Sequence, residues 1–241
     1  MPSRSIRTSR LAVTWLGHSA FKFETPGGRV VLIDPWLENP KAPPGAKKIR
    51  RVDLILVTHA HGDHLGNTVD IARRTGAKIA CIFDLSVYLA SKGVDNILGM
   101  NKGGTISVDG LNITMVDAKH SSDIDAGGML SPGGEAAGYI IEFENGLKVY
   151  HAGDTSVFGD MKIIAEIYKP EVAILPIGDH FTMGPREAAY ACKLLKPKKI
   201  IGMHYGTFPV LTGTPAELKR LLPPQTRKRV LELEPGKTVM L

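Results

Sequence analysis

The chain has 241 residues, of which 43% are hydrophobic and 22% are charged, and its formal net charge is +6. This balance is typical of a globular protein with a sizeable core, and the length suits one large α/β domain or two small ones. No apolar stretch is long enough to cross a membrane. Cys81 and Cys192 lie far apart and outside any CxxC pair, which excludes a dense disulfide scaffold and favours a reduced, cytoplasmic protein.

Basic residues gather in three short segments, 47–51, 193–199 and 227–229. The favoured interpretation is a solvated surface. The alternative is a weak attraction for an anionic partner, either a phosphorylated metabolite or a nucleic acid. Because no stacking aromatic residues are interleaved with these segments, nucleic acid is the weaker of the two partners.

Apolar runs rich in Val, Ile and Leu alternate along the chain with segments of helical pattern. The runs predict strands at 11–16, 20–24, 29–33, 52–57, 78–83, 112–117, 138–143, 147–151, 171–176, 198–203, 228–233 and 237–241. The helical pattern predicts helices at 63–75, 85–92, 159–168, 185–195 and 215–222. No clear linker, low-complexity tract or short repeat interrupts this order, so we expect a single domain over residues 1–241.

Turn-forming residues mark the ends of several of these elements. Asn145-Gly146 separates two strands and predicts a hairpin, because both turn positions tolerate a positive φ. Pro235-Gly236 predicts a similar turn between the last two strands. Proline is tolerated in the first turn of a helix, so Pro215 is expected to open the last helix, with Thr214 as its cap.

Two long segments carry too many loop-forming residues for a strand or a helix. Residues 38–48 are rich in proline, and residues 121–138 carry Ser, Asp, Gly and Pro directly after His120. Each is either a flap over a site or an ordinary surface connection, and both interpretations stay open.

A His or an Asp follows each of six predicted strands at or near its carboxyl end. These six residues are Asp34, His59, His120, Asp154, His180 and His204. In α/β sheets, functional groups gather outside the carboxyl ends of strands, where loops converge. We therefore expect these side chains to meet in one site.

The segment Thr58-His59-Ala60-His61-Gly62-Asp63-His64 places three imidazoles and a carboxylate directly after a buried strand. Imidazole nitrogen and carboxylate oxygen are ligands that zinc prefers. A spacing of two lets His59 and His61 face the same side of an extended chain, whereas Asp63 and His64 open a helix and point elsewhere. The segment therefore predicts a metal site with room for a second ion beside the first.

The pattern His59-x-His61-x-Asp63-His64 after a buried strand resembles the signature of the metallo-β-lactamase superfamily. Supporting segments spread this resemblance over nearly the whole chain, at 15–19, 151–155, 178–185 and 203–206. Within the superfamily the chain is most similar to uncharacterised metal-dependent hydrolases grouped with ascorbate-6-phosphate lactonase. The resemblance implies an α/β fold of four layers, an αββα sandwich of two mixed sheets flanked by helices.

The resemblance also implies a role for each candidate ligand. A first divalent ion would be bound by His59, His61 and His120. A second would be bound by Asp63, His64 and His204, and Asp154 would bridge the two ions. A histidine-rich set suits zinc best, although manganese, iron or nickel fit the same donors.

Five other polar residues have more than one interpretation. Asp34 matches an acidic residue that supports the ligands in this superfamily, or it is a simple turn residue. His151 ends a strand and faces either the core or an outer carboxylate. His18 and His180 lie in loops that match the subgroup, and either is a candidate to touch substrate or to protonate a leaving group. Tyr205 is a candidate donor to a developing oxyanion, or it packs as an ordinary aromatic residue.

We expect a hydrolase in which the metal pair activates water against an ester, lactone or phosphoester bond. Asp63 would orient the nucleophile, and His180 is the second catalytic candidate. One alternative is a nucleic-acid phosphodiesterase with the same metal pair. An oxygen- or nitric-oxide-reducing di-iron protein is disfavoured, because such relatives have Glu where this chain has His61. A non-catalytic metal-binding module is disfavoured because every expected ligand position is filled.

The expected partner is a small-molecule substrate, and the basic segments permit that substrate to be negatively charged. No association with a membrane is expected. A homo-oligomer stays open. The resemblance places the substrate pocket among loops 35–50, 121–137 and 178–184, whose conformations cannot be read from one sequence. The substrate itself is therefore not predicted.

Overall fold

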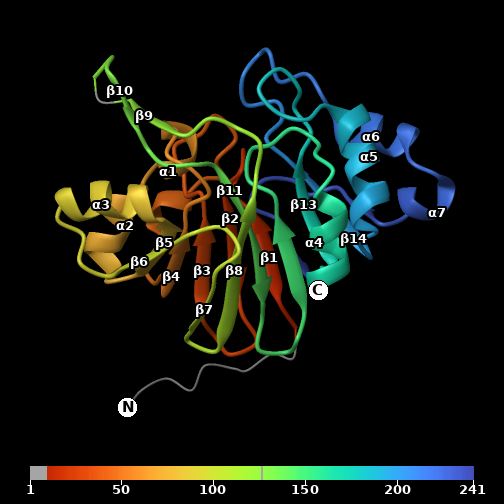
Figure 1. The fold of residues 1–241 in the computed structure, drawn as a ribbon. Coiled ribbons are helices and arrows are strands. Elements are labelled where there is room, and N and C mark those ends of the chain that lie inside the picture. The colour runs from red at the N-terminus through yellow and green to blue at the C-terminus, as the bar shows by residue number, and fades with distance from the viewer. Residues whose placement is uncertain (1–9, 126) are drawn as a thin grey trace.

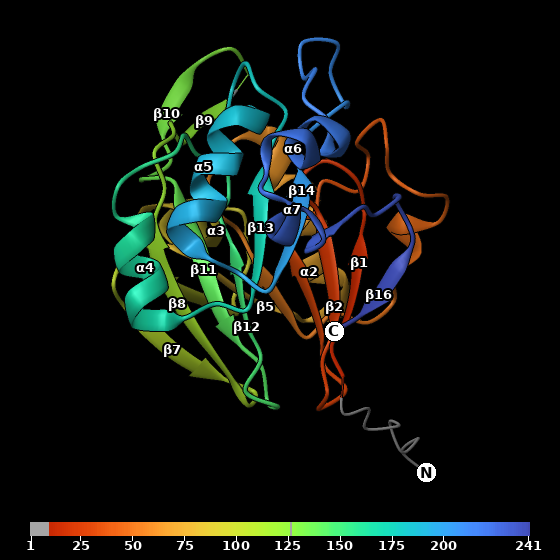
Figure 2. The same ribbon diagram turned by 90° about the vertical axis from the view of Figure 1, so that its right-hand side faces the viewer.

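Two seven-stranded sheets lie face to face in the middle of the molecule, and helices cover the outer side of each (Figures 1 and 2). The structure is a computed structural model, and it describes residues 10–125 and 127–241. Most strands coincide with the apolar runs of the sequence, because a strand covered on both faces is apolar along its whole length. This arrangement confirms the predicted α/β class and the αββα sandwich of two mixed sheets flanked by helices.

The first sheet has the strand order β16-β1-β2-β3-β4-β5-β6. Its strands are β1 (Ala12–Trp15), β2 (Phe21–Glu24), β3 (Val30–Ile33), β4 (Leu54–Leu56), β5 (Lys78–Ile82), β6 (Ile97–Met100) and β16 (Thr238–Met240). From β16 to β3 neighbouring strands are antiparallel. From β3 to β6 they are parallel, so the carboxyl ends of β3 to β6 share one edge.

The second sheet has the order β15-β14-β13-β12-β11-β8-β7. Its strands are β7 (Thr105–Val108), β8 (Leu111–Asp117), β11 (Ala137–Glu142), β12 (Lys148–His151), β13 (Val172–Pro176), β14 (Lys199–Met203) and β15 (Val230–Leu231). Strands β7, β8, β11 and β12 are antiparallel in turn, and β12 to β15 are parallel. The antiparallel pairing of β11 with β12 across Asn145-Gly146 confirms the predicted hairpin.

The helices divide between the two sheets (Figure 1). On the side of the first sheet lie α1 (Gly62–Leu65), α2 (Thr68–Thr75) and α3 (Phe83–Ser91), and on the side of the second lie α4 (Met161–Tyr168), α5 (Pro185–Leu195), α6 (Pro215–Leu221) and α7 (Pro224–Arg227). The hydroxyl of Thr214 accepts a hydrogen bond of 3.2 Å from the Glu217 N–H, which confirms the predicted cap of α6. None of the helices among the described residues is long and apolar enough to cross a membrane.

An apolar core fills the space between the sheets, and a second cluster lies between the second sheet and helices α4 to α6. In the first core, the rings of Phe23 and Phe143 have centroids 5.6 Å apart. Tyr139 of β11 donates a hydrogen bond of 2.8 Å from its hydroxyl to the Val57 carbonyl of the opposite sheet. Because Val57 directly precedes the candidate metal-binding segment, this bond fixes that segment against the second sheet.

The single helix predicted at 63–75 is wrong, because α1 and α2 are separate helices that meet at Gly66. Gly66 has φ 43° and ψ −123°, and a Cβ at this position would lie 2.6 Å from the Cα of Trp36. Only glycine suits such a conformation at so close an approach. The break leaves Asp63 and His64 on a one-turn helix whose direction is independent of α2.

The turn predicted at Pro235-Gly236 does not join the last two strands into a hairpin. The turn itself is present, since Gly236 has φ 85° and the Lys237 N–H bonds the Glu234 carbonyl at 3.0 Å. However, β15 pairs with β14 in the second sheet, and β16 pairs with β1 in the first. The chain therefore crosses between the sheets at this turn, and a turn signal does not encode which sheet the next strand joins.

Both segments expected to lack regular structure contain some. Residues 121–138 include a separate hairpin of β9 (Asp123–Asp125) and β10 (Leu130–Pro132), which projects at the upper left of Figure 1. Residues 38–48 include the 3-10 helix η1 (Ala46–Lys48). The sequence pattern also fails to predict β6 and β7, because their side chains are mostly half-buried or exposed and form no long apolar run.

Candidate metal centre

The seven predicted metal ligands meet at the edge of the sandwich where strands of both sheets end. They come from the loop after β4 (His59, His61), from α1 (Asp63, His64) and from the loops after β8 (His120), β12 (Asp154) and β14 (His204). They fall into groups whose ligand atoms lie within 4.8 Å of one another. The expectation that side chains at the strand ends converge is therefore correct for His59, His120, Asp154 and His204.

The first group consists of His59, His61 and His120. The Nε2 atom of His59 lies 3.0 Å from Nδ1 of His61, and the ring of His120 has its centroid 5.1 Å from each of the other two. His59 is buried, whereas His61 and His120 are partly exposed, so this group opens to solvent. Burial lowers the pKa of all three imidazoles, which keeps them neutral near pH 7, as metal binding requires.

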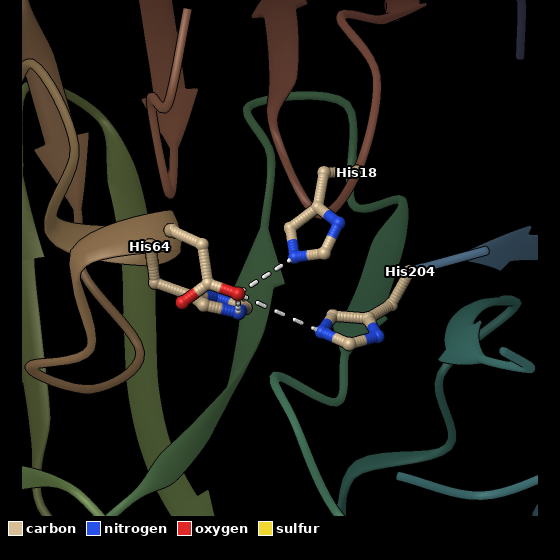
Figure 3. Close-up of side chains that lie close together, drawn as sticks. His18, His64 and His204 are labelled. Carbon is tan, nitrogen blue, oxygen red and sulfur yellow. Dashed lines mark hydrogen bonds and ion pairs between the residues drawn. The ribbon is translucent and has the colours of Figure 1, made fainter. Parts of the chain in front are cut away.

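The second group contains Asp63, His64 and His204, together with His18. Asp63 Oδ2 accepts a hydrogen bond of 3.0 Å from His18 Nε2 and lies 3.9 Å from His64 Nε2 and 4.0 Å from His204 Nε2. Figure 3 shows the three imidazoles turned toward one carboxylate oxygen. Burial opposes ionisation of Asp63, but His64 and the hydrogen bond from His18 outweigh it and hold its pKa below the usual range.

Asp154 lies between the two groups. Its Oδ2 atom is 2.9 Å from His204 Nε2, 3.2 Å from His64 Nε2 and 3.7 Å from His120 Nε2. The side chain is buried, which opposes ionisation, but His204 and His64 hold its pKa well below the usual value. An ionised carboxylate is therefore within reach of ligands from both groups.

The donor set fits a metal ion. Asp154 Oδ1 is buried and has no hydrogen-bond partner among the described residues. Buried polar atoms without a partner are rare, and a bound ion is one of the explanations they call for. Burial disfavours the charged form of His64, but the carboxylates of Asp154 and Asp34 raise its pKa well above the usual value, so a cation is favoured at this point. Imidazole and carboxylate donors together are those of zinc and of similar divalent ions.

Comparison with known proteins identifies the family. Residues 29–205 match the model of the Beta-lactamase superfamily domain. The chain belongs to the metallo-β-lactamase superfamily. It is 50% identical over 229 residues to a UPF0173 metal-dependent hydrolase of Koribacter versatilis, with 95% of this chain and 97% of the relative covered. A UPF0173 metal-dependent hydrolase of Methanopyrus kandleri is 53% identical over 211 residues, which are 87% of this chain and 90% of the relative.

A solved structure is also similar over nearly its whole length. Igni18, a metallo hydrolase of Ignicoccus hospitalis, is 40% identical to this superfamily member, with a TM-score of 0.86, and the match covers 96% of this chain and 98% of that one. The protein is a metal-dependent hydrolase of the metallo-β-lactamase superfamily. The similarity to ascorbate-6-phosphate lactonase stays a prediction.

Asp34 of this hydrolase lies behind His64. Its Oδ2 is 2.8 Å from His64 Nδ1, and its Oδ1 accepts a hydrogen bond of 2.8 Å from the Thr58 N–H. The Thr58 hydroxyl donates a further bond of 2.7 Å to Oδ2. Asp34 thus occupies the supporting position that the resemblance implies, and it also has the positive φ of a turn residue, at 45°.

Three residues at this site have a backbone conformation with positive φ. Besides Asp34, His18 has φ 52° and His204 has φ 55°. A positive φ is uncommon in residues other than glycine and costs on the order of 1–3 kcal/mol, so the surrounding structure must hold these residues in place. Such strain is typical of functional sites.

His18 joins the second group, although the sequence places it only in a loop with an open role. It is fully buried, its Nδ1 lies 2.6 Å from the Thr207 hydroxyl, and burial lowers its pKa to about 4. The spacing of residues cannot reveal this contact, because His18 is 45 positions from Asp63. The signals in the sequence are its place directly after the predicted first strand and its position in segment 15–19, which carries part of the resemblance.

His151 and Tyr205 have contacts that hold the surrounding loops. His151 Nε2 lies 3.2 Å from the Ser19 carbonyl, and its Nδ1 accepts a hydrogen bond of 3.2 Å from the Gly153 N–H, next to Asp154. The ring of Tyr205 stacks on Trp15 with centroids 5.0 Å apart, and burial raises its pKa to about 12. Both side chains therefore pack within the protein beside the centre.

His180 is exposed on the loop after β13. Its ring meets that of Phe181 edge to face with centroids 4.4 Å apart, and its φ is 61°. Within the described part of the chain, no hydrogen bond or ion pair joins this imidazole to a candidate ligand. The structure therefore does not bring His180 into the two ligand groups.

Proposed function

We propose that this hydrolase uses two divalent metal ions to cleave an ester, lactone or phosphoester bond of a small molecule. The observation that carries the proposal is the position of Asp154, whose Oδ2 lies 2.9 Å from His204 Nε2 and 3.7 Å from His120 Nε2. A carboxylate between two ligand groups suits a pair of ions about 3.5–4 Å apart.

Each group would hold one ion. The first ion would be held by His59, His61 and His120, and the second by Asp63, His64 and His204, with Asp154 shared between them and His18 beside the second ion as the hydrogen-bond donor to Asp63. Zinc is the first candidate, and manganese, iron and nickel fit the same donors. When bound, such ions lower the pKa of water toward neutrality and polarise the bond that is cleaved.

Asp63 is placed to orient the attacking water. Its side chain is partly exposed and ionised, so it accepts a hydrogen bond from water, while the bond from His18 fixes its direction. His180 is the proposed proton donor to the leaving group, since its neighbour Phe181 lines the same cavity as Asp63. The compartment that we propose is the cytoplasm, which the two buried free thiols support.

A hydrolysis screen tests this function. Purified protein loaded with zinc, and separately with manganese, is assayed against carboxylic esters, lactones, phosphomonoesters and phosphodiesters. We expect hydrolysis of at least one class, loss of that activity in Asp154→Ala, and retention of it in Asp95→Ala, which changes an exposed aspartate outside the centre.

Three outcomes contradict the proposal. One is a protein that binds no divalent metal, and another is an Asp154→Ala variant that hydrolyses as fast as the parent. Hydrolysis by the protein after complete removal of metal with a chelator would also exclude the metal-dependent step.

A further inference from the structure

A cavity of about 570 Å³ opens directly beside the second ligand group. Its lining residues are Trp36, Gly62, Asp63, Phe181, Phe208 and Val210. Asp63 belongs both to this lining and to the second group, so a molecule in the cavity touches the centre. Loops 35–50 and 178–184 contribute to it as expected, whereas the third expected loop, 121–137, adds no residue to this lining. Phe208 and Val210 come from a segment that the sequence does not single out.

One wall of the cavity is a packed set of rings. Trp36 and Phe208 stack with centroids 5.8 Å apart and an interplanar angle of 27°. His18 meets Trp36 edge to face at 5.2 Å and Phe208 at 5.6 Å. Since His18 also bonds Asp63, the aromatic wall continues without interruption into the second group.

The other side of the cavity consists of exposed apolar side chains. Phe181 is 54% exposed and Val210 is 43% exposed. Exposed phenylalanine and valine are normal when scattered singly, but together with Trp36 and Phe208 they form a concave apolar surface next to polar catalytic groups. This combination is the usual composition of a small-molecule site, and the volume lies within the usual range.

The charge of the lining restricts what the cavity accepts. Among the residues that the structure describes, Asp63 is the single charged one in the lining, and no lysine or arginine belongs to it. A negatively charged group placed there would face a carboxylate and find no counter-charge, whereas an apolar group would be removed from water against aromatic rings. If the substrate carries a negative charge, that charge therefore belongs to the part of the substrate that lies over the metal ligands, not to the part in the cavity.

We propose that this cavity binds an uncharged, ring-sized apolar group of the substrate, attached next to the bond that is cleaved. The inference rests on the proposed function, because it places the cleaved bond at the centre that Asp63 shares. According to this inference, the substrate is an ester or phosphoester of a hydrophobic group, preferably an aromatic one, and not a sugar phosphate.

A pair of phosphonates tests the inference without using activity. Phenylphosphonate and methylphosphonate carry the same metal-binding group and differ only in the apolar part. Calorimetric titration of the zinc-loaded protein, at a pH where both are dianions, gives the ratio of their dissociation constants. We expect phenylphosphonate to bind about tenfold more tightly or better, because its ring is buried in the cavity.

Two variants locate the effect. Phe181→Ala removes one side of the cavity but leaves the Trp36–Phe208 wall, so it is expected to lower the ratio. Tyr190→Ala removes an aromatic ring that is 53% exposed on α5, away from this cavity, and is expected to keep the ratio of the parent. Folding of each variant is checked by circular dichroism.

The outcomes separate this inference from the function on which it rests. If both phosphonates bind with equal affinity, the cavity does not hold the apolar group, while the metal centre stands. If neither binds to zinc-loaded protein, the proposed centre itself is wrong and the inference fails with it. If Phe181→Ala has the same ratio of dissociation constants as the parent, the preference for phenylphosphonate arises at another surface. That result would overturn the inference.

Discussion

Asp34 contacts the ring nitrogen of His64 that faces away from the metal centre, since Asp34 Oδ2 lies 2.8 Å from His64 Nδ1. This contact turns His64 Nε2 toward Asp154, 3.2 Å away, and toward Asp63, 3.9 Å away. A histidine that ligates a metal commonly binds a carboxylate through its other nitrogen, which fixes the tautomer and raises ligand basicity. The acidic partner of His64 is thus built into the turn after β3.

Asp34→Asn is expected to weaken metal binding about 10- to 100-fold. The amide keeps the shape of the side chain and tolerates the positive φ, but it no longer offers His64 a charged acceptor. Competition titration with a chromophoric chelator measures the change. Asp95→Ala serves as the control and should bind metal as the parent does. If Asp34→Asn has the same metal affinity as these two proteins, Asp34 acts only as a turn residue.

Gly66→Ala is expected to destabilise the fold and to displace α1. The new Cβ would lie 2.6 Å from the Cα of Trp36 and 2.8 Å from the Pro35 carbonyl oxygen, which are backbone atoms that cannot move aside cheaply. Overpacking of this kind costs about 1–3 kcal/mol, before the strain of the backbone is counted.

Urea unfolding measures that loss, and metal titration detects displacement of Asp63 and His64. Gly159→Ala is the matched control, because a Cβ at that position meets nothing within 4 Å. A Gly66→Ala variant as stable as Gly159→Ala, with the metal affinity of the parent, would contradict the role assigned to this residue.

Cys81 and Cys192 are expected to be inert in the folded protein. Burial raises the pKa of both thiols to about 12. An acid whose pKa is raised by folding stays protonated in the native state while the unfolded chain ionises, so the free energy of unfolding falls as pH rises from about 9 toward 12. Ellman's reagent at pH 8 should label neither thiol in native protein and both in guanidinium chloride. Rapid labelling of the native protein would refute the burial of these side chains.

Much of the centre is predictable from the sequence, because its ligands follow strands that are themselves visible as apolar runs. The local segment from His59 to His64 predicts a metal site by composition and spacing alone. His120, Asp154 and His204 become part of it only because the carboxyl ends of strands from both sheets meet at one edge.

The remaining features depend on contacts between distant parts of the chain. The end of the first helix at Gly66 is set by the backbone of Trp36, 30 positions earlier. His18 enters the second group because β1 and β4 belong to the same sheet, which no local pattern encodes. Phe208 and Val210 complete the apolar cavity from a loop with no motif of its own.

The two aspartates of the centre are expected to differ in their effect on metal content. Among the described residues, Asp63 has its short ligand-atom distances to the second group, so Asp63→Ala should keep about one tightly bound ion per chain. Asp154 approaches both groups, so Asp154→Ala should weaken both ions. Elemental analysis after gel filtration measures the content, with His180→Ala as a histidine variant that should keep two ions. Equal losses in Asp63→Ala and Asp154→Ala would contradict the shared position of Asp154.

Anomalous X-ray diffraction from crystals of the zinc-loaded protein tests the dinuclear centre most directly. We predict two anomalous peaks, one among His59, His61 and His120 and the other among Asp63, His64 and His204, with the carboxylate of Asp154 between them. A single peak, or peaks away from these side chains, would contradict the account.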